Sequence, residues 1–202
     1  MIHFTFFQGK GGMGLKRAVH FSPVPVLIRV AAALILLGGI GWAGSHGGPP
    51  PALQSLPVDG HMRMSPSDRC PVCAMFPARH PKAAAAMTLI SGETFYFCGN
   101  GCLLRAWLRP TVYLGKPRDA VDRLVVQDYF TGRPIDGRGA IWIAGSDVVG
   151  PMGPAIVAVG NADQAIVFKK RHGGKTTFTF DQIDDALWRK ISRRNLPAAK
   201  TE

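Results

Sequence analysis

Hydrophobic and polar residues are distributed differently in three parts of the chain. Residues 1–43 end in a long apolar run, residues 44–68 have no periodic apolar pattern, and residues 69–194 alternate short apolar runs with Gly, Pro, Asn and Asp. Short apolar runs bounded by such turn residues are typical of strands and short helices in a folded body. We therefore expect the folded body to begin at about Arg69 and residues 195–202 to form a tail.

The first half of the body, residues 69–135, predicts a hairpin, a helix and a strand. Its first two apolar runs are separated only by Ser91-Gly92, and a short break that contains glycine favours a hairpin. The next segment has helical spacing of its apolar residues and is followed by Pro110, which we expect to end the helix. The expected elements are strands at 83–90 and 93–98, a helix at 102–108 and a strand at 122–130.

The second half, residues 136–194, repeats this order. The expected elements are strands at 140–144 and 155–159, a helix at 162–170 and a strand at 176–180. A last, amphipathic helix is expected at 181–194, with Asp181 as its N-cap. The pattern therefore predicts an α+β fold made of two small, similar ββαβ-type subdomains that meet near residues 132–139.

The first 43 residues have the pattern of an export signal. Lys10, Lys16 and Arg17 precede an apolar stretch whose uninterrupted core covers residues 30–43. Basic residues before an apolar run place the N-terminus in the cytoplasm and the rest of the chain outside it. The core is shorter than the roughly 20 residues of a spanning helix, and Gly41-Trp42-Ala43 fits a cleavage site. We expect the body on the periplasmic side of a bacterial inner membrane, either anchored by this helix or released by cleavage.

Residues 44–68 indicate a linker. The Gly/Pro run at residues 47–51 is typical of a partly stiff tether. Near the end of the linker, His61-Met62-Arg63-Met64 places three soft or borderline metal ligands within four residues. We interpret them either as part of an ordinary disordered segment or as an entry or exit point for a metal ion.

Charge and composition restrict the classes of partner. The chain has 24 Lys and Arg against 13 Asp and Glu, a net charge of +11, and 47% hydrophobic residues. This hydrophobic content is sufficient for a real core. The positive surplus favours anionic lipid heads or an acidic partner. Basic residues do not form a stripe interleaved with aromatic residues, so we do not expect nucleic acid as a partner.

All four cysteines lie in the first half of the body. They form a C-x2-C pair, Cys70 and Cys73, and a C-x3-C pair, Cys98 and Cys102, at an expected strand-to-helix turn. Two such pairs are typical of a metal site. Three interpretations stay open: an exchangeable soft-metal site, a closed zinc site with a structural role, and disulfide bonds, which exported proteins form.

Two methionines favour copper among these alternatives. Met75 follows the first cysteine pair, and Met152 lies in a Gly-Pro-Met-Gly-Pro turn between two expected strands. Thioethers are poor zinc ligands but good Cu(I) ligands, because soft sulfur matches a soft ion. A core role is the alternative for Met152. An ion held by thiolates and a thioether would keep an open position for exchange, which a closed Cys₄ site would not.

No motif in the chain predicts turnover chemistry, and we expect that the protein is not an enzyme. Only His80 and His172 lie in the body, and neither has the context of a nucleophile or of an H-E-x-x-H site. His80 is a candidate further metal ligand, whereas His172 fits the end of a helix. The enzymatic alternative is a thiol-disulfide oxidoreductase built on Cys70-Pro71-Val72-Cys73, although the βαβ pattern of a thioredoxin-like fold is missing.

Several segments are distinctive when taken together. They are Cys70-Pro71-Val72-Cys73-Ala74-Met75, Asp128-Tyr129-Phe130-Thr131 with Pro134-Ile135-Asp136, Gly145 to Gly153, and His172-Gly173-Gly174. In this order they resemble the nitrous oxide reductase accessory family called NosL, over about residues 69–191. The resemblance implies a membrane-tethered periplasmic Cu(I) chaperone that works with a maturation transporter complex to supply the copper centres of nitrous oxide reductase. It also implies two ββαβ subdomains, with copper ligands at Cys70, Cys73, Met75 and Met152.

The chain departs from the family pattern at three points. Ala74 stands where the family usually has glycine, and an apolar N-terminal segment stands where many members resemble lipoproteins. Cys98 and Cys102 are outside the family motif and are more similar to small cysteine-cluster metal-trafficking modules. A different recipient cuproenzyme therefore stays open as a client. The candidate metal ligands are Cys70, Cys73, Met75, Cys98, Cys102 and Met152, for Cu(I) or, alternatively, zinc.

Overall fold

The computed structural model describes residues 56–198 of the chain. The expected N-terminal membrane segment and residues 44–55 of the expected linker lie outside these residues. Within the described range, no helix is long and apolar enough to cross a membrane. Two antiparallel sheets are present together with several helices, so the expected α+β class is confirmed.

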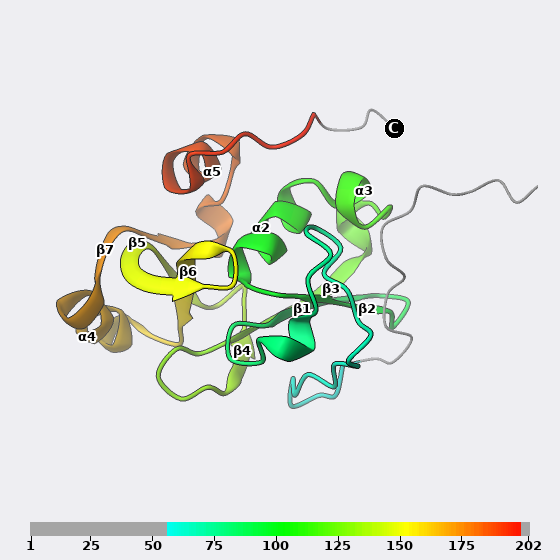
Figure 1. Cartoon of the computed structure of the whole chain (residues 1–202), viewed down its shortest axis with the longest axis horizontal. Helices are drawn as coiled ribbons and strands as arrows, with labels where there is room; N and C mark the ends of the chain where they lie inside the picture. Colours follow the sequence, from blue (N-terminus) through cyan, green and yellow to red (C-terminus); the bar gives the residue numbers. More distant parts are fainter. Residues whose placement is uncertain (1–55, 199–202) are drawn as a thin grey trace, which may run out of the picture. The chain divides into compact units, whose positions relative to one another are not determined.

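The first half of the body forms a four-stranded antiparallel sheet in the order β2-β1-β3-β4 (Figure 1). Its elements are η1 (Pro77–Arg79), β1 (Ala85–Leu89), β2 (Thr94–Phe97), α2 (Asn100–Leu108), α3 (Pro110–Tyr113), η2 (Arg118–Ala120), β3 (Val121–Gln127) and β4 (Pro134–Asp136). The expected hairpin is confirmed, with Ala85 of β1 opposite Phe97 of β2. Every residue of these two strands is buried, because other parts of the fold cover both faces of the hairpin.

The second half forms a three-stranded antiparallel sheet in the order β6-β5-β7. Its elements are β5 (Ile141–Gly150), β6 (Gly153–Val159), α4 (Ala162–His172), β7 (Gly173–Thr179), η3 (Phe180–Gln182) and α5 (Asp185–Ser192). Each half therefore follows the β-β-α-β order that the sequence predicts. The exact boundary between the halves stays a prediction.

The two halves share one hydrophobic core. Its largest cluster contains Phe97 and Leu104 from the first half and Trp142 and Phe178 from the second. The rings of Trp142 and Phe178 stack with their centroids 6.3 Å apart, and Trp142 Nε1 donates a hydrogen bond of 3.1 Å to the carbonyl of Gly137. Burying a large apolar side chain contributes roughly 2–3 kcal/mol. Packing between the halves is therefore a substantial part of the stability.

Asp128, directly after β3, connects the halves through hydrogen bonds. Its side chain is 2% exposed. Oδ1 accepts hydrogen bonds from the backbone N–H groups of Phe130 and Thr131, and Oδ2 accepts one of 2.9 Å from Gly160, which precedes α4. Burial alone would raise the pKa of Asp128, but these hydrogen bonds outweigh it and hold the pKa below its ordinary value. Asp128 therefore stays ionised and holds the two halves together by accepting hydrogen bonds from both.

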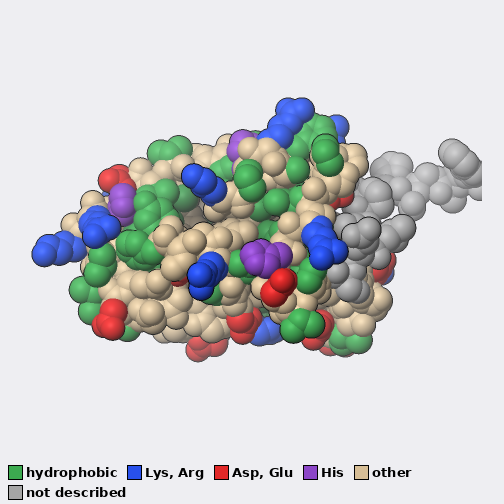
Figure 2. Space-filling view, turned by 90° about the horizontal axis from the view of Figure 1, so that it is seen from below, with side chains coloured by type: hydrophobic (Ala, Val, Ile, Leu, Met, Phe, Trp, Pro, Cys, Tyr) green, Lys and Arg blue, Asp and Glu red, His purple; other side chains and the backbone are tan. Residues whose placement is uncertain are grey.

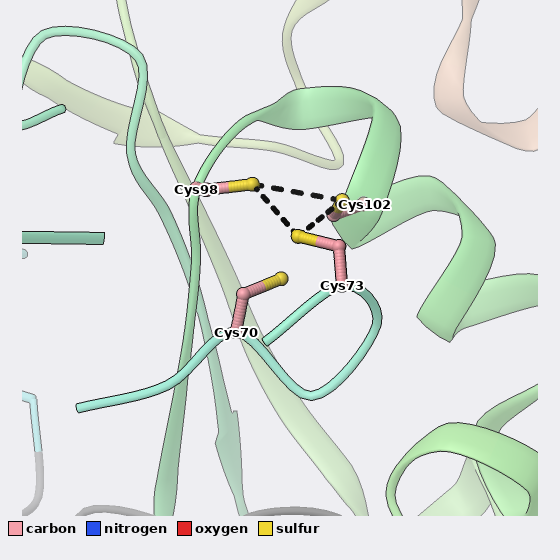
Figure 3. Close-up of side chains that lie close together, drawn as sticks. All are labelled: Cys70, Cys73, Cys98 and Cys102. Atoms are coloured by element: carbon pink, nitrogen blue, oxygen red, sulfur yellow. Dashed lines mark hydrogen bonds between the residues drawn. The ribbon is translucent and has the colours of Figure 1, made fainter. Parts of the chain in front are cut away.

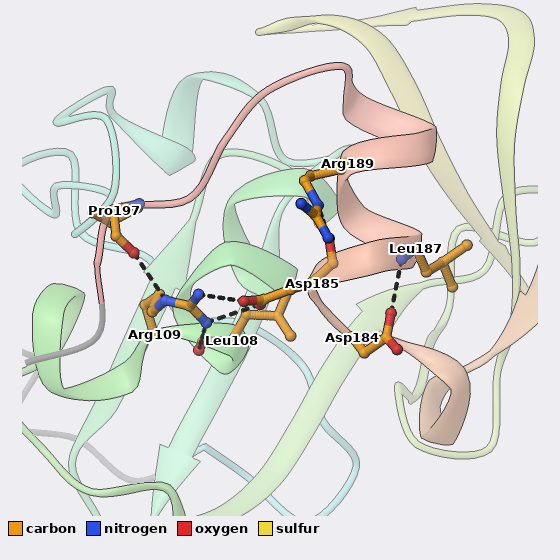
Figure 4. Close-up of polar contacts among 7 residues, drawn as sticks. All are labelled: Leu108, Arg109, Asp184, Asp185, Leu187, Arg189 and Pro197. Atoms are coloured by element: carbon orange, nitrogen blue, oxygen red, sulfur yellow. Dashed lines mark hydrogen bonds and ion pairs between the residues drawn. The ribbon is translucent and has the colours of Figure 1, made fainter.

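The C-terminal helix is held against α2 and α3 by one arginine (Figure 4). The guanidinium of Arg109 pairs with both carboxylate oxygens of Asp185 and also donates to the carbonyl of Pro197. The side chain of Asp184 accepts a hydrogen bond of 2.7 Å from the N–H of Leu187 and caps α5. These contacts place α5 next to α2, the helix that carries Cys102.

The structure differs from the expected elements at several points. Pro110 begins α3 besides ending α2, because proline is tolerated in the first turn of a helix. The strand expected at 122–130 ends at Gln127, since the Asp128 side chain forms a turn with the residues after it. Asp181 is not a helix N-cap; it lies in η3, and α5 begins only at Asp185. The three-residue strand β4 was not expected, because it is an edge strand that contains proline.

The surface mixes positive charge with apolar side chains. On the face seen in Figure 2, Lys and Arg side chains are spread among hydrophobic ones. Large exposed apolar side chains include Val149 and Met152 in the second sheet and Ile166 and Val167 on α4. In the first half, Ile90 in the turn between β1 and β2 is also exposed, so both halves present apolar side chains to solvent.

Candidate metal centre

The structure brings all four cysteines together (Figure 3). Cys70 and Cys73 lie on the loop before η1, Cys98 directly follows β2, and Cys102 is in the first turn of α2. Their four Sγ atoms all lie within 4.8 Å of one another. The Sγ distances are 3.3 Å for Cys73–Cys98, 3.7 Å for Cys98–Cys102 and 3.8 Å for Cys102–Cys73.

These distances match the separation of sulfur ligands around a single metal ion. A tetrahedral ion with metal–sulfur bonds of about 2.3 Å separates its sulfurs by about 3.8 Å. A disulfide would need about 2.05 Å, and all four thiols are free. Cys70, Cys98 and Cys102 are buried, whereas Cys73 is partly exposed. The cluster can therefore accept one ion with little rearrangement, and Cys73 is its most accessible thiol.

The loop that carries the first pair is closed by its own backbone. The N–H of Cys70 donates to the carbonyl of Met75, and the N–H of Ala74 donates to the carbonyl of Cys70, each at 2.8 Å. This tight closure places Ala74 at φ +61°, a left-handed conformation that costs a residue with a Cβ about 1 kcal/mol. Glycine, which the family resemblance leads one to expect here, would avoid that cost. The guanidinium of Arg69 donates to the carbonyl of Ala74 and holds the turn.

The second pair sits at a helix N-terminus without a side-chain cap. Gly99 is the N-cap residue of α2, and the first turn contains no acidic residue. A helix N-terminus has unpaired N–H groups and a partial positive charge, both of which stabilise thiolates. Cys98 and Cys102 flank this end. The sequence folds this way because a strand that ends at Phe97 passes through one glycine into the helix.

The four thiols compete for their protons. Hydrogen bonds from Cys102, Cys70 and Cys98 lower the pKa of Cys73 well below its ordinary value. Hydrogen bonds with Cys70, Cys73 and Cys98, together with burial, raise the pKa of Cys102. In the metal-free cluster Cys73 therefore ionises before Cys102. Metal ions bind thiolates, so uptake of an ion must displace the remaining protons.

The two candidate methionines lie in different surroundings. Met75 is partly buried and packs against the cluster of core residues that includes Cys70, Cys98 and Cys102. Met152 is 43% exposed in the turn between β5 and β6, so a core role for it is not supported. Met152 and Cys102 both line one cavity. The structure thus places Met75 against the core that contains three of the cysteines, and Met152 in the lining of a cavity that Cys102 also lines.

Other soft or borderline ligands lie apart from the cluster. His80 is not in the four-residue metal-ligand group found among residues 56–198. Met62 and Met64 are partly buried against a separate core cluster around Tyr96, so their segment is packed rather than disordered. His172 ends α4, as expected, and both of its ring nitrogens are engaged, Nδ1 with Asp147 at 2.9 Å and Nε2 with Tyr129 at 3.0 Å.

Comparison with known proteins gives matches over the same part of the chain. A family model described as NosL matches residues 61–188. The copper-binding lipoprotein NosL of Stutzerimonas stutzeri is 28% identical over 124 residues, which cover 60% of this chain. The chain spans 64% of the length of that relative. The crystal structure of the copper chaperone NosL from Shewanella denitrificans has a similar fold, with a TM-score of 0.52 and 23% identity over 64% of this chain and 99% of that one. Because the family model takes in more than half of the residues, this chain belongs to the NosL family.

Proposed function

We propose that this protein is a copper chaperone that binds Cu(I) at its cysteine cluster and delivers it, without turnover chemistry, to a cuproenzyme outside the cytoplasmic membrane. The observation that carries the proposal is the approach of four Sγ atoms to within 4.8 Å in a member of the NosL family. The name of the Stutzerimonas relative, a copper-binding lipoprotein, supports both the metal and a location outside the cytoplasm. Nitrous oxide reductase and its maturation transporter complex are the proposed partners, as the family name suggests.

The proposed site has a holding part and a transfer part. Cys70, Cys73, Cys98 and Cys102 hold the ion, with Met75 close enough through the loop to adjust it. Met152 is exposed across the cavity that Cys102 lines, where a thioether can take the ion transiently. Soft sulfur ligands select Cu(I) over harder ions. An ion that leaves three buried thiols is helped by such an intermediate ligand, because Cys73 is the one thiol of the four that a flat partner surface can reach.

A structural zinc site is the second candidate. It is favoured by the same geometry, because four mostly buried thiols at these distances also suit tetrahedral Zn²⁺. The two functions differ in how readily the bound ion is exchanged and in how much the ion contributes to the stability of the fold. A structural zinc ion contributes about 10 kcal/mol of folding free energy and resists replacement, whereas a delivered copper ion must leave while the fold persists.

The test is a competition and transfer experiment on the full chain under anaerobic conditions. The zinc-loaded protein is challenged with Cu(I), and the copper form is then mixed with a Cu(I) chelator while the rate of transfer is followed. The proposal predicts that Cu(I) displaces zinc, that the chain stays folded after transfer, and that Met152→Ala slows transfer without changing the copper content. Zinc that Cu(I) cannot displace, with unfolding on its removal, would establish the structural zinc site instead.

A further inference from the structure

A cavity of about 920 Å³ lies beside the cysteine cluster. The first turn of α2, including Asn100 and Cys102, forms one wall, and the β5–β6 hairpin with Met152 forms another. The end of α5, with Trp188 and Lys190, also contributes. The volume is at the upper end of the range of ligand pockets, about 300–1,000 Å³. The cavity is therefore large enough for several residues of a peptide.

The charge of the cavity wall is almost entirely positive. Six basic residues line it, and they are Lys82, Arg105, Lys175, Lys190, Arg193 and Arg194. None of the six has a carboxylate partner among residues 56–198, where the ion pairs found involve other residues. The one acidic residue in the wall is Asp128, whose oxygens already accept hydrogen bonds from within the protein. The wall therefore attracts anionic groups and has no acid of its own to neutralise it.

The wall also contains polar groups that lack partners. Four buried side-chain atoms have no hydrogen-bond partner within the described part of the chain, and all four belong to residues that line this cavity: Asn100, Gln127, Ser146 and Trp188. Trp188 is 3% exposed, and its indole Nε1–H can only donate. The uncapped N-terminus of α2 adds backbone donors to the same wall. Asn100 Oδ1 and Gln127 Oε1 can only accept, and Ser146 Oγ can do either, so the four atoms match the N–H and C=O groups of a peptide backbone rather than carboxylates. Buried polar groups are nearly always satisfied in proteins, and a bound segment would satisfy these four after a small movement of the side chains that cover them.

We infer that the cavity receives an acidic, soft-ligand-bearing segment of the protein with which this chain exchanges its metal ion. This inference rests on the proposed function, because Cys102 belongs both to the lining of the cavity and to the cysteine cluster proposed to hold the ion. Cys102 is only 4% exposed, so a flat protein face cannot reach it, whereas an inserted segment can. Carboxylates of the segment face the basic residues, its apolar atoms face the apolar walls near Ile156 and Val157, and its sulfur approaches Cys102.

The test uses two synthetic nine-residue peptides, one that alternates Glu with Met and one that alternates Lys with Met. Each is titrated against the full chain in detergent, in its copper-loaded form, at low and at high salt. The test variant is Lys175→Glu/Lys190→Glu. The matched control is Lys169→Glu/Lys170→Glu, which changes the net charge equally on exposed lysines that do not line the cavity. Lys169 and Lys170 lie in the last turn of α4 and Lys190 lies in the last turn of α5, so the helix dipole disfavours the control variant at least as much as the test variant.

The inference predicts that the Glu-Met peptide binds and the Lys-Met peptide does not. Reversing the two cavity charges should weaken binding about tenfold at low salt and less at high salt, and the control variant should bind like the original protein. Equal binding to both variants, or equal binding of both peptides, would overturn the inference. If acetate or glutarate at millimolar concentration displaces the peptide completely, the site binds small carboxylates and the segment is also excluded.

Copper content separates this inference from the proposed function. Each variant is analysed for copper per chain before the titration, and the account predicts no difference among them. If copper content is unchanged and the peptide binds the cavity variant as tightly as the original protein, only the docking inference is refuted. A chain that holds no copper at all would refute the proposed function, whatever the peptide does.

Discussion

The two halves of the body reach a helix in the same way and then use its N-terminus differently. In the second half, Asn161 caps α4 by accepting a hydrogen bond of 2.9 Å from the N–H of Gln164. Gln164, at the third position of the helix, in turn accepts one of 2.7 Å from the N–H of Gly160. In the first half, Gly99 provides no cap, and the third position of α2 is Cys102.

This difference indicates that the thiol cluster takes the place of a helix cap. In α4 the unpaired N–H groups and the partial positive charge are satisfied by side chains of the helix itself. In α2 no side chain accepts from these N–H groups, and Cys98 and Cys102 lie beside them. The partial positive charge there favours thiolates, although within the metal-free cluster the pKa values of both thiols are raised. A single strand–turn–helix pattern thus ends in a capped helix in one half and in a helix flanked by two thiols, the proposed metal ligands, in the other.

The largest expected effect comes from replacing the thiol at the third position of α2. Cys102→Ser should lower Cu(I) affinity by more than the roughly 10–100-fold that residues around a ligand typically contribute, because it removes a proposed ligand. The matching change in the other half, Gln164→Ala, should leave copper affinity unchanged. Both are measured by competition with a Cu(I) chelator. Retention of full affinity in Cys102→Ser would show that the C-x₃-C pair does not hold the ion.

The connection between the halves should account for the next largest effect. Asp128→Asn places an amide nitrogen against backbone donors, and the loss of charged hydrogen bonds should cost about 3 kcal/mol. Because the folded pKa of Asp128 is lowered, its stabilisation is full above the unfolded carboxyl pKa of about 3.9 and is lost as the pH falls through the folded value. Chemical denaturation at pH 7 and at lower pH should show that the original protein loses more stability on acidification than the variant does. A variant as stable as the original protein at pH 7 would contradict the claim that the Asp128 carboxylate stabilises the contact between the halves.

Exchanging the caps between the halves should have opposite effects of about 1 kcal/mol. Asn161→Ala removes a cap and should destabilise the protein without affecting copper. Gly99→Ser adds one to α2, where the backbone is extended and an added Cβ would meet only the carbonyl of Ala83, at 3.9 Å. The metal-free form should become more stable, and copper affinity should fall because the hydroxyl competes for the N–H groups. Thermal unfolding with and without copper measures both. Unchanged stability of metal-free Gly99→Ser would mean that α2 has no vacant cap.

The smallest effect is expected at the loop of the first cysteine pair. Ala74 and Arg193 are the non-glycine residues with positive φ in the described chain, whereas the second sheet uses glycine at such positions, for example Gly145 and Gly153. Ala74→Gly should stabilise the protein by about 0.5 kcal/mol, since relief of backbone strain exceeds the entropy that glycine adds to the unfolded chain. Denaturation of the metal-free protein measures this difference. A loss of stability would show that the lower entropy of alanine in the unfolded chain outweighs the backbone strain of alanine at positive φ.

The sequence predicted local features well and tertiary ones only in part. The Ser91-Gly92 break and the repeated β-β-α-β order depend on neighbouring residues, and both are confirmed. The early start of α5 predicted at Asp181 was wrong, because Asp184 competes as a cap and the two positions cannot be distinguished by pattern alone. The turn at Asp128 had a local signal that was missed, because an Asp followed closely by Thr131 and Gly132 favours a turn. Its contact with Gly160, which is distant in the sequence, could not be predicted from local pattern.

The same contrast between local and tertiary features applies to the candidate site. Cysteine spacing made the four thiols candidate metal ligands, and the structure brings their Sγ atoms within 4.8 Å of one another. The sequence left open whether Cys98 and Cys102 join the first pair, because that depends on how the loop before η1 packs against the start of α2. The strain at Ala74 and the missing cap of α2 were not predicted, because both depend on backbone geometry. The basic cavity was missed for another reason: Lys82, Lys175 and Lys190 come from three separate segments and meet only in the folded chain.

The most direct test of the central claim is X-ray absorption on the full chain, loaded with Cu(I) without oxygen, after copper and zinc have been counted. The account predicts about one copper per chain in a shell made only of sulfur, and loss of sulfur ligands in Cys102→Ser. Copper bound through nitrogen or oxygen, or a zinc ion that keeps copper out of the four thiols, would contradict it.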